Sequence, residues 1–532
     1  MNAGAANILT RPLSAAQRGT LVLGLISVYA AVALYWASAA YLNPDEATFY
    51  PSIAADTVEE AYVAARRHPH PPLWPMLLSL VSQLADSPTA LRLPSVVAAG
   101  LGVWFTYRWI ELLAGSTAAL CGAGFLLSSF ALLGIASEVR PYAGLWLFET
   151  ATLWAVEAFV QQRSWRPLTA LTLAMAAAVL SHYSMIFVAA ALGIYVCARL
   201  LPTLPARRWL MPWAIGQAMV IAVAGWALFI HGAEHSGRIT RGETLWWVRA
   251  GVWGRESFVE FLGRIALGIW QHIETGTAPA LAAAALFLAG IYQLLRNRLS
   301  PTCGPRRYGG WATLLLLLPF LVSLAAAAQG AYPSGRSRHT NFLLPLAAAG
   351  VGAGAAALLR GRERLAGVAA IAVTIVSLIV RVPNNNPKVY DPQHVRAAVD
   401  YLRNEVPPGA TLFIDGQSGN AISYYLRRHG EPVTRWRGRG RPHLELIGLS
   451  FVRVRPPQWE LSPRSLRSAV PATARQYGFR AGDEIWVLST GWNNKSPLTQ
   501  GLPRQQWIDH RSFGRIQIVR MRQPPRHRPG SG

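Results

Sequence analysis

The stretch LVLGLISVYAAVALYWASAAYLNPDEATFY, residues 21–50, joins a long apolar run to two adjacent carboxylates, Asp45 and Glu46. The apolar part is as long as the ~20 residues that an α-helix needs to cross the hydrocarbon core of a bilayer. Arg11 and Arg18 precede it, and the enrichment of arginine on the cytoplasmic side of membrane proteins places the acidic pair on the outer side. The stretch therefore predicts a first membrane span whose outer end carries two acidic groups.

The composition of the whole chain indicates many such spans. Of its 532 residues, 52% are hydrophobic and only 14% are charged, against about 25% charged residues in soluble domains. The formal net charge is +24, but the arginines lie between apolar runs, which favours membrane topology and membrane lipids over a nucleic-acid partner. The three cysteines, Cys121, Cys197 and Cys303, are far apart, so the sequence has neither a disulfide framework nor a metal-binding spacing.

Ten further apolar runs follow the first, which makes about eleven spans. They lie at residues 90–110, 117–137, 141–160, 167–182, 184–201, 210–231, 277–295, 311–330, 340–358 and 364–381. Arginine-rich loops alternate along this series and fall on the side of the N-terminus, as the positive-inside rule requires. Loop 43–89 is then external, and its apolar piece at 73–84 is too short to span. The segment 258–274 fits either an interfacial helix or a further short span.

The composition changes after Arg381. Residues 383–387, PNNNP, are typical of a linker, and residues 391–405 have the apolar spacing of an amphipathic helix. Strands are predicted at 411–415, 484–488 and 516–519. We therefore expect a polytopic α-helical membrane domain at 1–381, a small extracytoplasmic α/β domain at 382–522 and a disordered tail at 523–532.

Polar groups interrupt the outer ends of several spans, where charged side chains are costly and have a reason to be retained. They are Asp45-Glu46, His68 and His70 among prolines, Glu138 and Arg140 before Tyr142, His182-Tyr183, and Arg336-Ser337-Arg338-His339. A carboxylate at such a boundary can act as a general base if burial raises its pKa, and guanidinium groups fit phosphate oxygens. Each cluster alone also fits a structural role, such as a helix cap, an ion pair, a turn or a headgroup contact.

Together these elements resemble the GT-C superfamily of membrane glycosyltransferases, in the branch of the protein O-mannosyltransferases and the aminoarabinose–lipid A transferases. The matching motifs follow one another through about residues 20–381. They are Asp45-Glu46, His70-Pro71-Pro72-Leu73, Leu91-Arg92-Leu93-Pro94-Ser95, Glu138 with Arg140-Pro141-Tyr142, His182-Tyr183, and the run from Arg338 to Leu346. One departure is His339, which stands after Arg338 where the family usually has a tyrosine. The C-terminal domain carries no specific match.

The resemblance implies a GT-C-like fold and an inverting transfer of a sugar from a polyprenyl-phosphate donor to an acceptor, on the outer face of a bacterial cytoplasmic membrane. It assigns Asp45 as the general base, with Glu46 and Glu138 as supporting acidic groups. Arg140, Arg336 and Arg338 are expected to hold the donor phosphate. Supporting roles are expected for His70, Tyr142, His182, Tyr183 and His339. These roles agree with the chemistry, because the leaving phosphate is anionic and the acceptor must lose a proton.

Several questions stay open at this level. The acceptor can be a glycan, a lipid or a protein, the sugar is not specified, and a divalent metal is possible because metal use varies in the superfamily. A transporter or flippase of lipid-linked substrates is one alternative, and it predicts inverted repeats and charges buried within spans. The other alternative is a non-catalytic membrane scaffold, which would tolerate the loss of Asp45.

Overall fold

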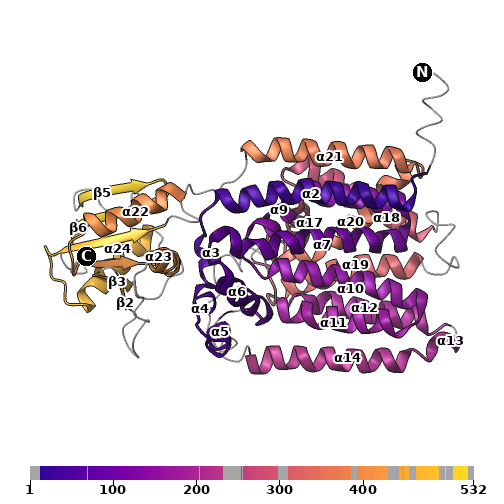
Figure 1. Cartoon of the computed structure of the whole chain (residues 1–532), viewed down its shortest axis with the longest axis horizontal. Helices are drawn as coiled ribbons and strands as arrows, with labels where there is room; N and C mark the ends of the chain where they lie inside the picture. Colours follow the sequence, from indigo (N-terminus) through magenta and orange to yellow (C-terminus); the bar gives the residue numbers. More distant parts are fainter. Residues whose placement is uncertain are drawn as a thin grey trace, which may run out of the picture. The chain divides into compact units, whose positions relative to one another are not determined.

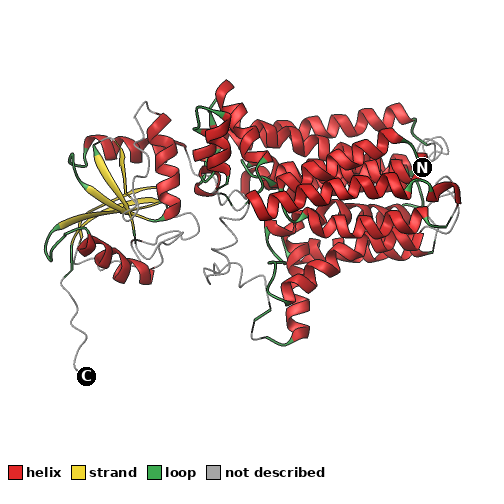
Figure 2. Cartoon of the chain, turned by 90° about the horizontal axis from the view of Figure 1, so that it is seen from below, coloured by secondary structure: helices red, strands yellow, loops and turns green. Residues whose placement is uncertain are grey.

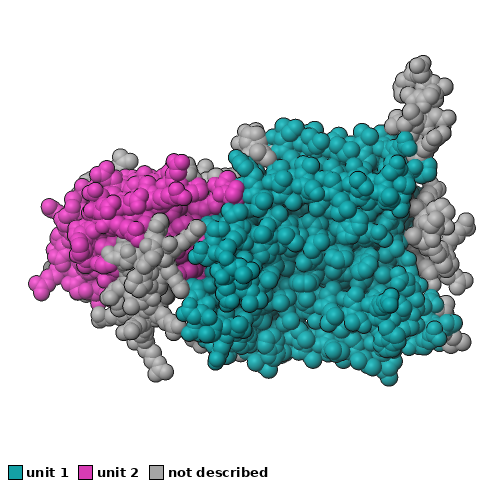
Figure 3. Space-filling model, viewed as in Figure 1, with its two compact units in different colours: residues 1–37, 52–385 teal, residues 38–51, 386–532 magenta. Residues whose placement is uncertain are grey.

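The chain forms two compact units (Figure 3). Unit 1 contains residues 1–37 and 52–385, and unit 2 contains residues 38–51 and 386–532. The computed structural model describes residues 12–66, 68, 70–202, 204–231, 253–254, 256–296, 309–384, 392–428, 443–446, 448–454, 463–490, 498 and 507–524. Most of the predicted tail, residues 525–532, lies outside this range.

Unit 1 is a bundle of long helices that run side by side (Figure 1). Its helices are α2 (Ala15–Ala39, whose last two residues belong to unit 2), α5 (Val58–Ala65), α6 (Leu73–Leu84), α7 (Pro88–Ala114), α8 (Ser116–Ser128), α9 (Phe130–Ser137), α10 (Tyr142–Gln162), α11 (Trp165–Ser181), α12 (Met185–Leu200), α13 (Leu204–Arg207), α14 (Leu210–Gly225), the π-helix η1 (Trp226–His231), α17 (Phe258–Ile273), α18 (Thr277–Leu295), α19 (Gly309–Ala328), the 3-10 helix η2 (Arg338–Leu343), α20 (Leu344–Leu358) and α21 (Glu363–Asn384). A short helix, α4 (Tyr50–Ile53), crosses the boundary between the units.

Each of the eleven predicted spans forms a helix or a pair of consecutive helices. Among the described residues, eight helices are long and apolar enough to cross a membrane. The number becomes nine if α8 and α9, which are bent by 63° at their junction, form one broken span. The other two, α11 and α12, are apolar but have only 17 and 16 residues. The predicted fold class, a polytopic helical membrane protein with a small C-terminal sheet, is confirmed.

The segment 258–274, which was predicted to be either an interfacial helix or a short span, forms α17. This helix begins with a capping box made by Ser257 and Glu260. Its residues Phe261, Ile265 and Ile269 are buried and recur every four positions, so that they line one face of the helix. Within the described chain, α17 is not among the helices that are apolar enough to span. This amphipathic character favours the interfacial alternative.

Small residues allow close contact between helices of the bundle. A Cβ atom added at Gly290 of α18 would lie 1.9 Å from the carbonyl oxygen of Gly350 in α20. One added at Gly354 of α20 would lie 2.0 Å from the carbonyl oxygen of Leu286. Because lipid offers no hydrophobic drive between helices, such backbone contact is a main source of their association.

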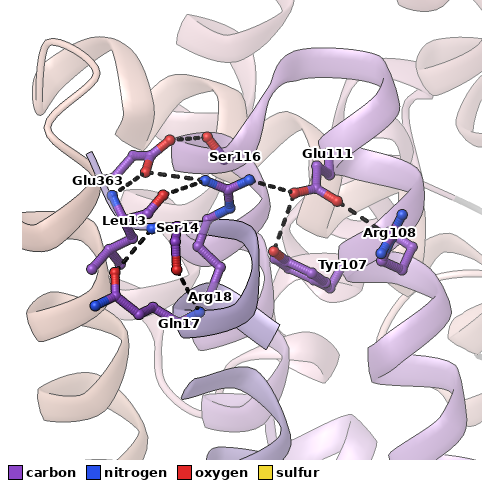
Figure 4. A network of polar contacts seen from close by, with 9 residues as sticks. All are labelled: Leu13, Ser14, Gln17, Arg18, Tyr107, Arg108, Glu111, Ser116 and Glu363. Atoms are coloured by element: carbon purple, nitrogen blue, oxygen red, sulfur yellow. Dashed lines mark hydrogen bonds and ion pairs between the residues drawn. The ribbon is translucent and has the colours of Figure 1, made fainter. Parts of the chain in front are cut away.

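A polar network joins four helix ends at the N-terminal side of the bundle (Figure 4). The guanidinium of Arg18 at the start of α2 lies 3.4 Å from the carboxylate of Glu111 in α7 and 3.4 Å from that of Glu363 in α21. Glu363 also accepts hydrogen bonds from the backbone of Leu13 and from Ser116 of α8. Arg108 of α7 lies 3.3 Å from the other carboxylate oxygen of Glu111, so two positive and two negative charges balance where these helices begin or end.

Unit 2 is a mixed six-stranded sheet with helices on both faces (Figure 2). Its elements are α3 (Pro44–Ala47), α22 (Pro392–Asn404), β1 (Thr411–Ile414), α23 (Gly416–Arg428), β2 (His443–Leu446), β3 (Leu449–Arg453), α24 (Pro463–Gln476), β4 (Glu484–Ser489), β5 (Trp507–Phe513) and β6 (Ile516–Arg522). The strand order is β2-β3-β1-β4-β6-β5, in which β3, β1 and β4 are parallel. The three predicted strands correspond to β1, β4 and β6, and the other three were not predicted.

The sheet of unit 2 separates two hydrophobic cores. One contains residues of α22 and α23, such as Val399 and Ile422. The other contains residues of α24, such as Leu466 and Val470. Tyr41 belongs to the first core although it lies directly after the first span in sequence. The sequence analysis placed residues 38–51 with the membrane domain, whereas in the structure they pack with the α/β domain.

Candidate functional site

Four of the predicted supporting residues form one cluster in unit 1, which we call the imidazole–tyrosine cluster: His70, Tyr142, His182 and His339. The ring centroids of Tyr142 and His182 are 4.9 Å apart, and those of His70 and His182 are 5.3 Å apart. The hydroxyl of Tyr142 lies 3.3 Å from Nδ1 of His339. Residues as far apart in sequence as 70 and 339 therefore meet at one place.

Helix ends and loops position these rings. His70 lies in the loop before α6, Tyr142 is the first residue of α10, and His339 is in the 3-10 helix η2. His182 follows the last residue of α11, where the backbone N–H of Ser184 donates to its Nδ1 at 3.2 Å. That nitrogen is the acceptor in the neutral ring, so Nε2 carries the proton and can donate to a ligand.

The electrostatic setting keeps two of the imidazoles uncharged. Burial, followed by the neighbouring His182 and Arg140, lowers the pKa of His70 well below its ordinary value. Burial, followed by Arg140, also lowers the pKa of His182. Both rings are therefore neutral at pH 7, and the positive charge beside them comes from the guanidinium.

Arg140 supplies that charge from the junction between α9 and α10. Its side chain is 6% exposed, and its Cζ atom lies 5.9 Å from the centroid of the Tyr142 ring. Arg338 begins η2 directly before His339 and is half-buried, whereas Arg336 is exposed. Of the predicted phosphate-binding residues, Arg140 is thus the most protected from water.

Two other predicted residues lie in unit 1 with different contacts. Glu138 is half-buried, and its backbone carbonyl accepts a hydrogen bond of 2.7 Å from the hydroxyl of Ser95. The hydroxyl of Tyr183 donates to the backbone carbonyl of Ala227 at 3.1 Å. That bond joins the α11–α12 loop to η1, so Tyr183 has a contact of its own beside the ring cluster.

Two further residues, which the sequence analysis did not assign to the site, are buried and make hydrogen bonds to other segments of unit 1. Nε2 of His231, in η1, lies 3.3 Å from the backbone carbonyl of His70. Arg92 is 1% exposed and donates to the carbonyl of Ala37 at 2.7 Å, near the end of α2. Arg92 belongs to one of the motifs that carry the resemblance, whereas no local pattern connects residue 231 with residue 70.

The acidic pair belongs to unit 2. Asn43 and Glu46 form a capping box at α3, in which the carboxylate of Glu46 accepts from the N–H of Asn43 at 2.9 Å. Glu46 is fully buried and Asp45 is 8% exposed. The carboxylate of Glu46 therefore already has a role in ordering the loop. The expected meeting of the acidic pair with the cluster stays a prediction.

Among the described residues, no group of three or more histidines, cysteines, aspartates or glutamates is arranged to hold a metal ion. The possible divalent metal therefore stays an open prediction.

The chain is similar to known proteins in part of its sequence and in its fold. The family model "Dolichyl-phosphate-mannose-protein mannosyltransferase" matches residues 69–230, a segment that contains His70, Arg140, Tyr142 and His182. The structure of ArnT from Cupriavidus metallidurans in the apo state is similar to the chain with a TM-score of 0.57, and the alignment covers 94% of this chain and 97% of ArnT. The chain is a membrane protein with the GT-C fold.

Two further structures share this GT-C fold. ArnT from the same organism bound to undecaprenyl phosphate also has a TM-score of 0.57, with 13% sequence identity and the same coverage. The identity to the apo structure is 12%. The oligosaccharyltransferase AglB from Archaeoglobus fulgidus, in complex with an inhibitory peptide and a dolichol-phosphate, has a TM-score of 0.50 and 11% identity, and the alignment covers 88% of this chain and 69% of AglB. A search of curated protein sequences found no match.

These comparisons confirm the predicted superfamily and the predicted enzyme class, a glycosyltransferase. They also confirm a multi-pass membrane protein. The residue roles, the acceptor and the orientation of the termini stay predictions.

Proposed function

We propose that the protein transfers a sugar from a polyprenyl-phosphate-linked donor to an acceptor at the outer face of the bacterial cytoplasmic membrane. The observation that carries this proposal is the imidazole–tyrosine cluster beside Arg140. It gathers hydrogen-bond donors and one buried positive charge at the ends of apolar spans, where a lipid-linked phosphate has to bind. The ArnT complex with undecaprenyl phosphate and the AglB complex with a dolichol-phosphate support a donor of this class.

The donors of the cluster suit the stabilisation of a leaving phosphate. Negative charge develops on the phosphate as the bond to the sugar breaks, and fixed donors in a water-poor site stabilise that charge most. We assign Arg140 and Arg338 as the charged contacts, and the Nε2–H of His182 and the hydroxyl of Tyr142 as neutral donors. Arg336, which is exposed, has a lesser share.

Asp45 is the general base in this proposal. The acceptor hydroxyl or amine must lose a proton as it attacks the anomeric carbon, and direct attack on the face opposite the phosphate inverts the configuration. Glu46 orders the loop through its bond to Asn43, and Glu138 is a supporting acid. The acceptor is a glycan, a lipid or a protein of the cell envelope.

The first test is a comparison of membrane lipids and surface glycans by mass spectrometry in cells with and without the gene. A sugar that disappears from one acceptor identifies both sugar and acceptor. The purified protein in liposomes is then assayed with that donor. Loss of the gene without any change in lipids or glycans would contradict the proposal.

The second test is Asp45→Asn. Loss of a general base typically costs 10²–10⁴-fold in rate, so we expect transfer to fall by about 100-fold or more while membrane insertion and donor binding are kept. Asp86→Asn is the matched control, because Asp86 is an exposed acid of the same external loop, and it should retain full activity. Transfer that persists in Asp45→Asn would show that another group is the base.

One observation keeps the flippase alternative in view. Glu149 lies within the span α10, is fully buried, and neither of its carboxylate oxygens has a hydrogen-bond partner among the described residues. An acid buried in a span is a feature of transport pathways. A fluorescent lipid-phosphate translocation assay distinguishes the two functions, because a flippase moves the lipid in the absence of an acceptor and loses that activity in Glu149→Gln.

A further inference from the structure

The acidic loop is held at both ends by the α/β domain. Residues 38–51 pack with unit 2 rather than with the span that precedes them. We infer that Tyr424 and Tyr425 of α23 are positioning residues for Asp45, so that the α/β domain sets the conformation of the proposed general base. This inference rests on the role of Asp45 in the proposed function.

The loop cannot hold its own shape. The helix α3 has only four residues, and isolated helices shorter than about 12 residues are marginal in water. The capping box of Asn43 and Glu46 satisfies the backbone at one end of α3, and its two hydrogen bonds run between residues of the loop itself. The conformation around Asp45 therefore depends on contacts with other elements.

Tyr425 holds the entrance of the loop. The backbone N–H of Leu42 donates a hydrogen bond to the hydroxyl of Tyr425, across 383 positions of sequence. The rings of Tyr41 and Tyr425 are 5.9 Å apart, and Tyr41 is only 2% exposed in the hydrophobic core that α22 and α23 share. The chain is thus fixed directly before the capping box.

Tyr424 holds the exit of the loop. Its ring meets the ring of Tyr50 edge-on at 5.6 Å, and the rings of Tyr424 and Tyr425 meet edge-on at 4.9 Å. The order Tyr41, Tyr425, Tyr424, Tyr50 is a continuous row of ring contacts, each within the 4.5–7 Å typical of aromatic pairs. Asp45 lies in sequence between the two outer members of this row.

Removal of the Tyr425 hydroxyl group tests the hydrogen bond at the entrance of the loop. Tyr425→Phe loses the bond to Leu42, and we expect kcat to fall about fivefold, the effect of one ordinary hydrogen bond, while KM for the donor is unchanged. Tyr424→Ala and Tyr425→Ala each break the row, and both should lower kcat at least tenfold.

The control is Tyr477→Ala. Tyr477 is a tyrosine of the same domain, but it packs against Phe413 in the core on the other face of the sheet. It weakens the domain without touching the loop, so kcat should stay near that of the wild type under conditions where all variants are folded. A fall in kcat equal to that of Tyr425→Ala would show that only the stability of the domain matters, and the inference would be overturned.

Hydrogen exchange of the full-length protein in detergent provides a readout that needs no substrate. We expect the amides of residues 42–50 to exchange faster in Tyr425→Phe and Tyr425→Ala, and unchanged in Tyr477→Ala. If both Tyr425 variants keep wild-type kcat and wild-type exchange, the inference is wrong, whereas the proposed function survives as long as Asp45→Asn is inactive. If the wild type transfers no sugar, the proposed function fails, and hydrogen exchange still decides whether the tyrosines hold the loop.

Discussion

In the proposed mechanism, binding of the donor phosphate depends most on Arg140. A buried guanidinium beside neutral rings binds an anion more strongly than an exposed one, because water and salt do not screen it. Lysine cannot replace its planar set of donors. Arg336 and Arg338 carry the same group with more exposure, so the three arginines form a natural series.

We expect Arg140→Gln to lower kcat/KM by about 100-fold, within the range measured when a donor to a developing oxyanion is removed. Arg140→Lys should recover only part of the loss. The effect of Arg336→Gln should be below about tenfold, since its charge is solvated. Steady-state kinetics with the lipid donor measure all three, and equal losses at residues 140 and 336 would contradict the assignment.

The lowered pKa values of His70 and His182 predict how the stability of the protein depends on pH. The pKa of His182 is lowered in the folded protein by burial and by Arg140, while in the unfolded chain it is about 6.5. Below pH 6.5 the unfolded ring binds a proton that the folded ring does not. This stabilising contribution is therefore complete above pH 6.5 and is lost as the pH falls toward the folded pKa. His70 shifts in the same direction.

We expect the melting temperature in detergent to fall between pH 7 and pH 5, and to fall less steeply in His182→Asn, which has no titrating ring at that position. The melting temperature is measured at constant ionic strength, so that surface charge screening stays the same. The same slope in both proteins would mean that His182 is not buried in its neutral form.

At the scale of elements, hydrophobic patterning was sufficient to predict the spans and three strands of the sheet. All eleven apolar runs became helices because backbone groups in lipid must be paired within the segment. The π-helix at 226–231 and the break between α8 and α9 carry no strong local signal. The contacts of His231 with residue 70 and of Leu42 with residue 425 depend on tertiary structure, so no sequence period reveals them.

The contact between α18 and α20 can be tested with single methyl groups. We expect Gly290→Ala to lower the thermal stability of the detergent-solubilised protein, because the added carbon would lie 1.9 Å from a backbone oxygen. Gly193→Ala in α12 has open space around it and should be neutral or slightly stabilising. The inactivation temperature, compared with that of the wild type, measures the difference, and equal values for the two variants would contradict the close contact.

At the scale of the molecule, unit 1 separates its polar groups toward opposite helix ends. α7 begins near Arg92 and Ser95, which contact Ala37 and Glu138, and ends with Glu111 in the network of Arg18 and Glu363. The sequence predicts the first end as external and the second as cytoplasmic. Of the predicted site, the ring cluster and Arg140 were found from motifs in linear order. The link between the acidic loop and the α/β domain was not, because nearly 400 residues separate the two.

Labelling with a membrane-impermeant maleimide tests this orientation in a cysteine-free background. Ser512→Cys in β5 and Ser14→Cys before α2 introduce thiols at exposed positions. We expect Ser512→Cys to be labelled in spheroplasts with an intact cytoplasmic membrane, and Ser14→Cys only after that membrane is permeabilised. The reverse pattern would invert the predicted topology.

The association of residues 38–51 with unit 2 has a consequence for biogenesis. In the predicted topology, the acidic loop reaches the far side of the membrane early in translation. Its partner Tyr425 in α23 lies 383 positions after Leu42 and is synthesised much later. Until then the nascent chain carries its first spans and its carboxylates without the tyrosines that order them. We therefore expect the acidic loop to become ordered only when the last domain is complete, and a chain that stops before α23 to insert into the membrane without that order.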